Sequence, residues 1–221
     1  MKRALVIGAS GGIGTAVTSE LKTKGYDVTG LSRRADGLDV TNEASIEAAL
    51  GQLEGPFDVI FVATGALEPS GHAPERAVRE VSSEAMHAAF RVNAVGPMLV
   101  LKHGLQLLPK DSPSVFAVLS ARVGSIGDNG IGGWHSYRAS KAALNQLIHG
   151  AAIEMKRTHK QATAVCLHPG TVETDFTAKY AGRHKTVPAT EAAANLVRVI
   201  EGIGPAQTGR FFDYAGQEVP L

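Results

Sequence analysis

The sequence is poor in several features that mark particular classes of protein. Its 221 residues include one cysteine, Cys166, which excludes a disulfide within the chain. This cysteine sits in an apolar segment, where we expect it to fill space in a buried strand. Lys and Arg number 22 and Asp and Glu 21, for a formal net charge of +1. Such a balance gives no electrostatic footprint for nucleic acid or for an anionic membrane.

Long apolar runs are also missing. The first run, residues 4–7, ends at Gly8 and is too short for the apolar region of a signal peptide. No stretch approaches the ~20 apolar residues of a membrane-spanning helix. The eight histidines show no spacing typical of a metal site. We therefore expect a cytoplasmic protein that contacts no membrane and holds no metal.

What the sequence does have is an alternation of short apolar segments and longer helical patterns. The expected strands are residues 4–7, 27–31, 57–63, 114–119, 162–167 and 210–213, and the expected helices are 12–24, 43–53, 83–108, 137–156 and 191–200. Strands that are apolar throughout are typical of a parallel sheet covered on both faces. The pattern predicts a doubly wound α/β fold of the Rossmann type. No linker or repeat divides the chain, so residues 1–221 form a single expected domain.

A glycine-rich turn joins the first expected strand to the first expected helix. Residues 8–14 read Gly-Ala-Ser-Gly-Gly-Ile-Gly, a Gly-xxx-Gly-x-Gly spacing. Such a turn lets a pyrophosphate approach the backbone, and the helix N-terminus offers it free N–H groups. A tight strand-to-helix turn without a ligand is the alternative. Its place after the first strand favours a dinucleotide site.

The end of the second expected strand indicates which dinucleotide binds. Ser32, Arg33 and Arg34 follow that strand, and Asp36 comes later, in the loop. NAD enzymes place an acidic residue here for the ribose 2′-hydroxyl, whereas an arginine accommodates a 2′-phosphate. The residues favour NADP over NAD. The alternative is that both arginines are merely solvated.

Tyr137 and Lys141 stand four residues apart at an expected helix start. This spacing puts both side chains on one face of the helix. A free tyrosine has a pKa of about 10, and a nearby ammonium group favours its phenolate. A tyrosine tuned in this way exchanges a proton with an alcohol or a carbonyl while a hydride moves.

Together these features resemble the short-chain dehydrogenase/reductase family over nearly the whole chain, and residues 120–145 resemble its C-factor-like and carbonyl-reductase-like branch. The matching motifs are residues 8–14, Asp39-Val40, Ala63-Thr64-Gly65, Asn93, Tyr137 with Lys141, and residues 169–174. The family's motif at positions 63–65 is usually Asn-Ala-Gly. By this match, residues 57–63 are the family's fourth strand, and its third is reduced to residues 38–40.

The resemblance implies roles for many residues. It makes Asn93, Tyr137 and Lys141 catalytic and places Val172 and Thr174 at the nicotinamide carboxamide. The full set expected at the cofactor is Gly8, Ser10, Gly12, Ile13, Gly14, Ser32, Arg33, Arg34, Asp39, Val40, Ala63, Thr64, Gly65, Asn93, Tyr137, Lys141, Pro169, Gly170, Val172 and Thr174.

Pro97 bears on the role of Asn93. A proline within a helix has no N–H to donate to the carbonyl four residues back, which here is that of Asn93. In the family, the carbonyl of this asparagine holds a water that links the lysine to solvent. An ordinary kink, with Pro97 starting a new helical turn, is the alternative.

The match fails at the family's catalytic serine. Alignment on Gly124 puts Ala121 at the serine position, with Ser120 one residue earlier. Adjacent residues of an extended chain point to opposite sides, so Ser120 reaches the substrate only if the strand end twists. Ser120 is the preferred candidate, and Ser125 or Ser136 are alternatives.

The substrate is the least defined element. Phe176 and Tyr180 are the expected apolar contacts in the loop 173–186, and Trp134 and His135 are expected near the entrance. A small aldehyde, ketone or alcohol is the expected substrate. By resemblance, the two long helices 83–108 and 137–156 pair in a homodimer or homotetramer.

Two functions remain open at this point. The first is an NADP-dependent oxidoreductase in which Tyr137 acts as general acid or base. The second is a non-catalytic NADP(H)-binding protein in regulation or signalling, which Ala121 at the serine position favours. A Tyr137→Phe variant separates the two.

Overall fold

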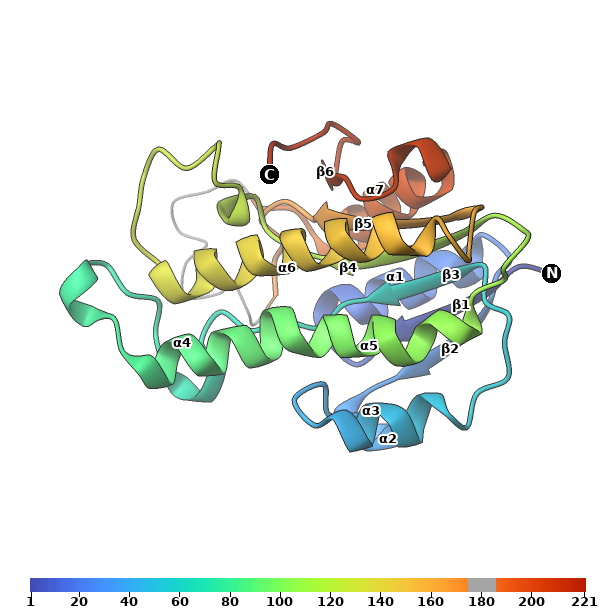
Figure 1. Cartoon of the computed structure of the whole chain (residues 1–221), viewed down its shortest axis with the longest axis horizontal. Helices are drawn as coiled ribbons and strands as arrows, with labels where there is room; N and C mark the ends of the chain where they lie inside the picture. The colour runs from blue at the N-terminus through green and yellow to red at the C-terminus, as the bar shows by residue number, and fades with distance from the viewer. Residues whose placement is uncertain (175–185) are drawn as a thin grey trace.

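The computed structural model describes residues 1–174 and 186–221 and has a six-stranded sheet at its centre (Figure 1). The strands are β1 (Arg3–Ile7), β2 (Asp27–Leu31), β3 (Val59–Val62), β4 (Ser114–Leu119), β5 (Ala162–His168) and β6 (Phe211–Asp213). Their order is β2-β1-β3-β4-β5-β6, and each neighbouring pair is parallel. The expected parallel α/β fold is confirmed.

Helices cover both faces of the sheet. They are α1 (Gly12–Thr23), α2 (Arg33–Asp36), α3 (Glu43–Leu50), α4 (Ser83–Phe90), α5 (Gly96–Gly104), α6 (His135–Met155) and α7 (Ala189–Gly202). The core under α1 and α7 is one apolar cluster, and the core under α3, α5 and α6 is another. Figure 1 shows α5 and α6 running side by side across one face, with α1 behind the sheet.

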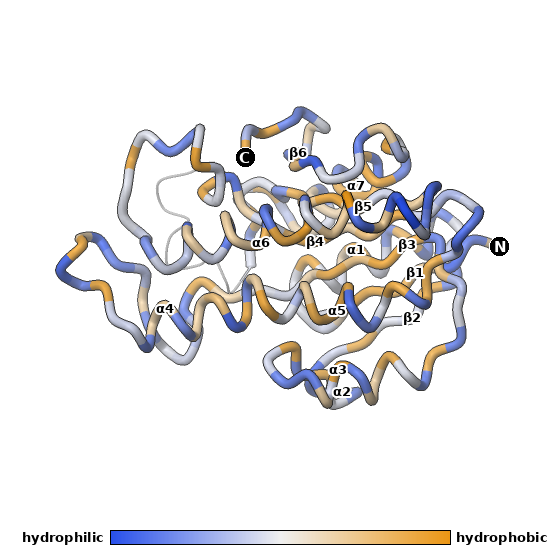
Figure 2. The backbone as a smooth tube through the Cα atoms, in the orientation of Figure 1, coloured by the Kyte–Doolittle hydropathy of each residue, from blue (hydrophilic) through white to orange (hydrophobic). Residues whose placement is uncertain are grey.

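The period-two geometry of a strand explains why the strands read as apolar throughout. In β3, Ile60 and Val62 belong to the cluster under α5 and α6, whereas Val59 and Phe61 belong to the cluster under α1 and α7. Along the helices, hydrophobic residues alternate with hydrophilic ones (Figure 2). Cys166 is 2% exposed within β5, which confirms it as a small filler of the core.

Several element boundaries differ from the sequence expectation. β3 is shorter than residues 57–63, since the Phe57 N–H donates to the Leu107 carbonyl at 2.8 Å instead of to a strand. Residues 38–40 form no strand, although Leu38 and Val40 are buried. The short helix α2 is an addition. Its N-cap is Ser32, whose hydroxyl accepts from the Ala35 N–H at 3.2 Å.

The helix predicted over residues 83–108 is a succession of helical segments that follow one another directly. Between α4 and α5, the segment Arg91–Val95 is π-helical, and Pro97 lies just inside α5. A π-helical turn absorbs the missing proline N–H by widening the turn before it. Asn93 lies in this segment and its side chain is completely buried.

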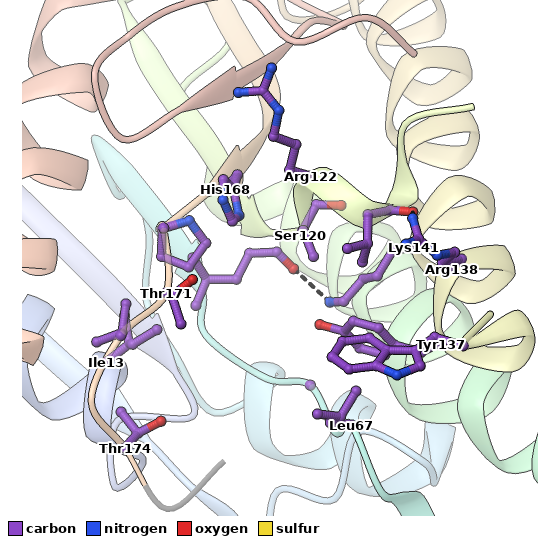
Figure 3. A pocket seen from close by; sticks show the side chains of 18 of the residues that line it. Ile13, Leu67, Ser120, Arg122, Tyr137, Arg138, Lys141, His168, Thr171 and Thr174 are labelled. Carbon is purple, nitrogen blue, oxygen red and sulfur yellow. Dashed lines mark hydrogen bonds between the residues drawn. The ribbon is translucent and has the colours of Figure 1, made fainter. Parts of the chain in front are cut away.

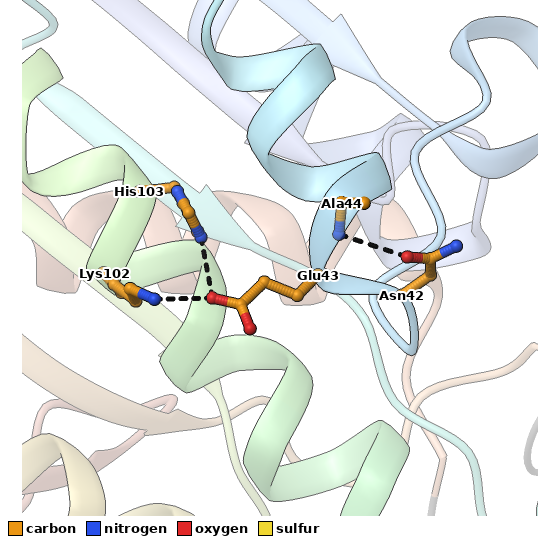
Figure 4. A network of polar contacts seen from close by, with 5 residues as sticks. All are labelled: Asn42, Glu43, Ala44, Lys102 and His103. Carbon is orange, nitrogen blue, oxygen red and sulfur yellow. Dashed lines mark hydrogen bonds and ion pairs between the residues drawn. The ribbon is translucent and has the colours of Figure 1, made fainter.

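A polar network on the surface joins α3 to α5 (Figure 4). Glu43 Oε1 lies 2.6 Å from Lys102 Nζ and 3.0 Å from His103 Nε2, and these contacts lower the pKa of its carboxyl. Asn42 caps α3 by accepting from the Ala44 N–H at 3.1 Å. Exposed ion pairs add little stability, so this network contributes little to the free energy of unfolding.

The first strand and first helix pack too closely for a side chain between them. An ideal Cβ on Gly14 would lie 2.1 Å from the Gly8 carbonyl oxygen. The glycine at position 14 therefore lets α1 begin directly against the end of β1, which sets the shape of the turn 8–14.

Candidate active site

A large cavity lies at the carboxyl ends of the central strands (Figure 3). Its volume is about 1610 Å³, which is room for a dinucleotide and a small substrate together. Ligands of open α/β sheets bind at this edge. Of the predicted residues, those that line it are Ser10, Gly12, Ile13, Ala63, Thr64, Gly65, Ser120, Tyr137, Lys141, Pro169, Gly170, Val172 and Thr174.

The other predicted residues are not in the cavity wall. Gly8 and Gly14 form the base of the glycine turn, and Asn93 is buried behind the wall. The remaining five, Ser32, Arg33, Arg34, Asp39 and Val40, lie beyond the turn, after the end of β2. The turn and the strand end are joined, because the Gly8 and Ala9 N–H groups donate to the Leu31 carbonyl at 2.8 and 3.1 Å.

The acid near the end of β2 is engaged by Ser32. Asp36 Oδ2 accepts from the Ser32 N–H at 2.7 Å and from its hydroxyl at 3.2 Å. Arg33 and Arg34 are exposed, and their guanidinium groups make no ion pair or hydrogen bond within the described residues. The local charge open to a ligand is therefore positive.

Asp39 and Val40 form the next bend of the chain. Asp39 Oδ1 accepts from the Thr41 N–H at 2.8 Å and from its hydroxyl at 2.7 Å, and these bonds lower the pKa of the carboxyl. The Val40 backbone packs on α5, since an ideal Cβ on Gly96 would lie 2.7 Å from its carbonyl oxygen.

Tyr137 and Lys141 share one face of α6, as their spacing predicts. Tyr137 is 7% exposed, and burial raises the pKa of its phenol, which therefore stays protonated at neutral pH. Lys141 Nζ donates to the Leu119 carbonyl at 2.9 Å (Figure 3). Burial lowers the pKa of Lys141 to about 8, so its ammonium form predominates at neutral pH. The cavity wall therefore holds a protonated phenol and an ammonium group four residues apart.

Asn93 is held in place by the hydrogen bonds of its side chain. Its Oδ1 accepts from the Ala66 N–H at 2.8 Å, and its Nδ2 donates to the Ala66 carbonyl at 2.9 Å and to Ser140 Oγ at 3.2 Å. Ser140 Oγ donates in turn to the Tyr137 carbonyl at 2.8 Å. The asparagine thus links the loop after β3 to the tyrosine helix.

Three serines were candidates for the hydroxyl that binds the substrate oxygen, and of these Ser120 lies at the cavity. Ser120 lines the cavity, but its hydroxyl donates to Asn145 Oδ1 on α6 at 2.7 Å. Within residues 1–174 and 186–221, the buried Asn145 Nδ2 has no hydrogen-bond partner. Ser125 Oγ accepts from the Asp128 N–H, and Ser136 Oγ donates to Glu75. Unlike Ser120, neither Ser125 nor Ser136 is among the residues that line the cavity.

Glu75 was not predicted, yet it contacts the start of the tyrosine helix. Its carboxylate accepts from the Ser136 N–H at 3.1 Å, and its carbonyl accepts from the Trp134 N–H at 2.5 Å. Burial raises the pKa of this carboxyl, but hydrogen bonds from Ser136 and from the backbone of Glu75, together with the nearby His135, hold the pKa below its usual range. Trp134 does lie near Tyr137, with the rings edge to face and their centroids 6.2 Å apart.

Two further groups in the wall were also missed. His168, at the end of β5, has a buried Nδ1 without a hydrogen-bond partner in the part of the chain that the structure describes, and burial lowers the pKa of its imidazole to about 4. Arg122 also lines the cavity, and its Nε lies 2.5 Å from Asp128 Oδ2 in an ion pair. Phe176 and Tyr180, the expected substrate contacts, lie outside the described residues.

Within residues 1–174 and 186–221, no group of three or more His, Cys, Asp or Glu side chains is arranged to hold a metal ion. None of the described helices has the length and apolar character that crossing a membrane requires.

The fold and this site define a nucleotide-dependent oxidoreductase, and the comparisons agree. Residues 8–208 match a family model described as enoyl-(acyl carrier protein) reductase. The chain is 30% identical, over 96% of both chains, to 1-hydroxy-2-glutathionyl-2-methyl-3-butene dehydrogenase of Rhodococcus sp. (strain AD45). It is 37% identical to C-signal of Myxococcus xanthus over 65% of this chain and 83% of that protein. The chain belongs to the short-chain dehydrogenase/reductase family of NAD(P)-dependent enzymes.

Solved structures of short-chain dehydrogenases/reductases have the same fold as this chain. A short-chain dehydrogenase/reductase from Burkholderia multivorans with bound NADP superposes with a TM-score of 0.85 at 29% identity, over 100% of this chain and 99% of that one. Carbonyl reductase from chicken fatty liver, solved with NADPH, superposes with a TM-score of 0.84 over the same shares at 22% identity, which supports the fold alone.

Proposed function

We propose that this chain reduces a small aldehyde or ketone with NADPH, with Tyr137 as the proton donor. The observation that carries the proposal is the buried, protonated phenol of Tyr137, four residues before the Lys141 ammonium in the wall of the cavity. The dehydrogenase from Rhodococcus is named for oxidation of an alcohol, which is the same chemistry in reverse.

The residues around the cavity fit NADP. The start of α1 places free N–H groups at the turn 8–14, where a pyrophosphate is stabilised. An ideal Cβ on Gly12 would lie 2.7 Å from Thr174 Cγ2, so the turn and the segment after β5 form one continuous wall. Beyond the turn, Arg33 and Arg34, whose guanidinium groups have no hydrogen-bond or ion-pair partner among the described residues, suit a 2′-phosphate. When bound, NADPH supplies the hydride that reduces the carbonyl carbon.

The protein's own contribution is to deliver the proton and to stabilise charge. As the carbonyl oxygen gains negative charge, the Tyr137 phenol donates its proton to it, because an alkoxide is far more basic than a phenolate. The Lys141 ammonium stabilises the phenolate that remains. We infer that the Asn93 carbonyl, which Pro97 does not engage, holds the water that returns a proton through Lys141.

Ser120 is the proposed second donor to the substrate oxygen. Its hydroxyl donates to Asn145 Oδ1, while Asn145 Nδ2 has no hydrogen-bond partner among the described residues. Turning the Asn145 amide by half a rotation satisfies that Nδ2 with Ser120 Oγ and leaves the serine proton free for substrate. The buried amide thus supports Ser120 in a donor role, although Ala121 occupies the family's serine position.

The pairing of two copies is a further part of the proposal. Val95, between α4 and α5, is 46% exposed, and Ile153, on α6, is 53% exposed. Apolar side chains on the outer surfaces of these adjacent helices suit an isologous contact between two copies, as family resemblance implies.

Replacing Tyr137 with Phe tests the proposed function. Because the ring is kept and only the proton donor is lost, we expect kcat/KM for NADPH-dependent carbonyl reduction to fall by about 100-fold or more. NADPH binding, measured by fluorescence titration, should be retained. The control is Tyr26→Phe, which changes a buried tyrosine directly before β2. Full activity in Tyr137→Phe would contradict the role of the phenol, and NADPH binding without turnover by the wild type would favour a non-catalytic protein.

Removing the two cations after β2 tests the choice of cofactor. In the double variant Arg33→Ala with Arg34→Ala, we expect the Kd for NADPH to rise by about tenfold or more, since charge-assisted bonds to the 2′-phosphate are lost. The Kd for NADH should hardly change. A double variant of two exposed arginines elsewhere, Arg79→Ala with Arg157→Ala, controls for net charge. Tighter binding of NADH than NADPH by the wild type would overturn the assignment.

Ser120→Ala tests the second donor. Loss of one such donor costs about 100-fold in kcat, and we expect a fall of that order with NADPH binding unchanged. Ser114→Ala removes a buried hydroxyl at the opposite end of the same strand and should leave kcat unaltered. If Ser120→Ala retains the wild-type kcat, its hydroxyl serves only to bind Asn145.

A further inference from the structure

The helix that carries Tyr137 has no cap of its own. α6 begins at His135, and its N-cap residue, Trp134, has a left-handed backbone with φ of 50° and no side-chain cap. The first turn of any helix leaves N–H groups without partners inside the helix. A non-glycine residue in the left-handed region persists only where its surroundings hold it. The start of α6 therefore depends on contacts from elsewhere in the chain.

Glu75 supplies these contacts from a distant segment. Its side chain accepts from the N–H and from the hydroxyl of Ser136, and its main-chain oxygen accepts from the Trp134 N–H. One residue thus holds both the left-handed N-cap and the second residue of α6. Neither contact is local, because Glu75 and Ser136 are 61 positions apart.

The negative charge of Glu75 suits the N-terminus of α6. The residue is 4% exposed, and within the described part of the chain its carboxylate forms no ion pair with Lys or Arg. A buried carboxylate needs polar partners, and the N–H groups and positive dipole end of a helix provide them. The start of α6 is therefore the main partner of the Glu75 charge.

We propose that Glu75 is a positioning residue that fixes Tyr137 at the cavity by holding the start of α6; its catalytic meaning rests on the proposed reductase function. Tyr137 directly follows Ser136. On the other side of Tyr137, Ser140 Oγ donates to its carbonyl and accepts from Asn93 Nδ2.

Both anchors of Tyr137 reach the same segment of the chain. Asn93 binds Ala66 through two hydrogen bonds, and Glu75 binds Ser136 and Trp134. The segment between them carries Leu67, and Arg76 follows it; both line the cavity. The segment that forms one wall of the cavity thus also sets the position of the proton donor, which couples the shape of that wall to catalysis.

The test compares Glu75→Gln with Glu80→Gln. The first substitution keeps the shape and removes the charge at α6, whereas Glu80 binds only the Arg76 N–H, at 2.8 Å, among the described residues. For Glu75→Gln we expect kcat to fall about tenfold, since small misplacement of a catalytic group is costly, while KM for NADPH is unchanged. Hydrogen exchange of residues 134–141 should be faster than in the wild type, and Glu80→Gln should match the wild type in all three measurements.

Ser136→Ala is the milder second variant if Glu75→Gln fails to fold. It removes one of the hydrogen bonds to Glu75 and should shift exchange and kcat in the same direction by a smaller amount. Wild-type exchange at residues 134–141 in the variants, or a wild-type kcat despite faster exchange, would overturn the proposal. If the wild type reduces no carbonyl, the proposed function fails, but the exchange measurement still decides whether Glu75 holds the start of α6.

Discussion

The burial of an ammonium group is the constraint on which this site depends. Lys141 is 2% exposed, and a charge removed from water must be held by polar atoms. The Leu119 carbonyl at the end of β4 accepts from it at 2.9 Å. Gly65 lies opposite, where an ideal Cβ would be 3.4 Å from both Lys141 Nζ and Asn93 Oδ1. The cost of burial appears as a pKa of Lys141 lowered to about 8, which still leaves a cation beside the tyrosine at neutral pH.

The scaffold around this cation is arranged to keep α6 close to the sheet. An ideal Cβ on Gly124 would lie 2.7 Å from Lys141 Cβ, so the short turn after β4 packs directly on the helix at the lysine. On the other side, the π-helical segment Arg91–Val95 brings Asn93 against Ser140 and the loop after β3. Sheet, turn and helix thus meet at one residue, and little movement of Tyr137 relative to the strand ends is possible without breaking these contacts.

Local patterns in the sequence predicted the features that depend on local physics. The alternation of β3 between two cores, the glycine turn before α1 and the four-residue spacing of Tyr137 and Lys141 all follow from short-range geometry, and the family and fold are confirmed. Contacts between distant segments were beyond this reasoning. Glu75 lies in a loop without a motif, and its partner is 61 positions away. Likewise, proline at position 97 indicated an interruption of the helix but not its π-helical form. The direction in which the Ser120 hydroxyl donates depends on Asn145, which lies one helical turn beyond Lys141 and belongs to no motif that pointed to it.

The central claim is that a protonated Tyr137 works beside a charged Lys141 whose pKa burial has lowered. The most direct measurement is the pH dependence of kcat/KM for NADPH-dependent carbonyl reduction between about pH 6 and pH 10, which reports the free enzyme. Since Lys141 loses its charge as the pH rises through its lowered pKa, the account predicts a plateau at neutral pH and a fall above about pH 8, with an apparent value that belongs to the coupled pair. A rate that stays constant or rises up to about pH 10, where free lysine and tyrosine titrate, would contradict it.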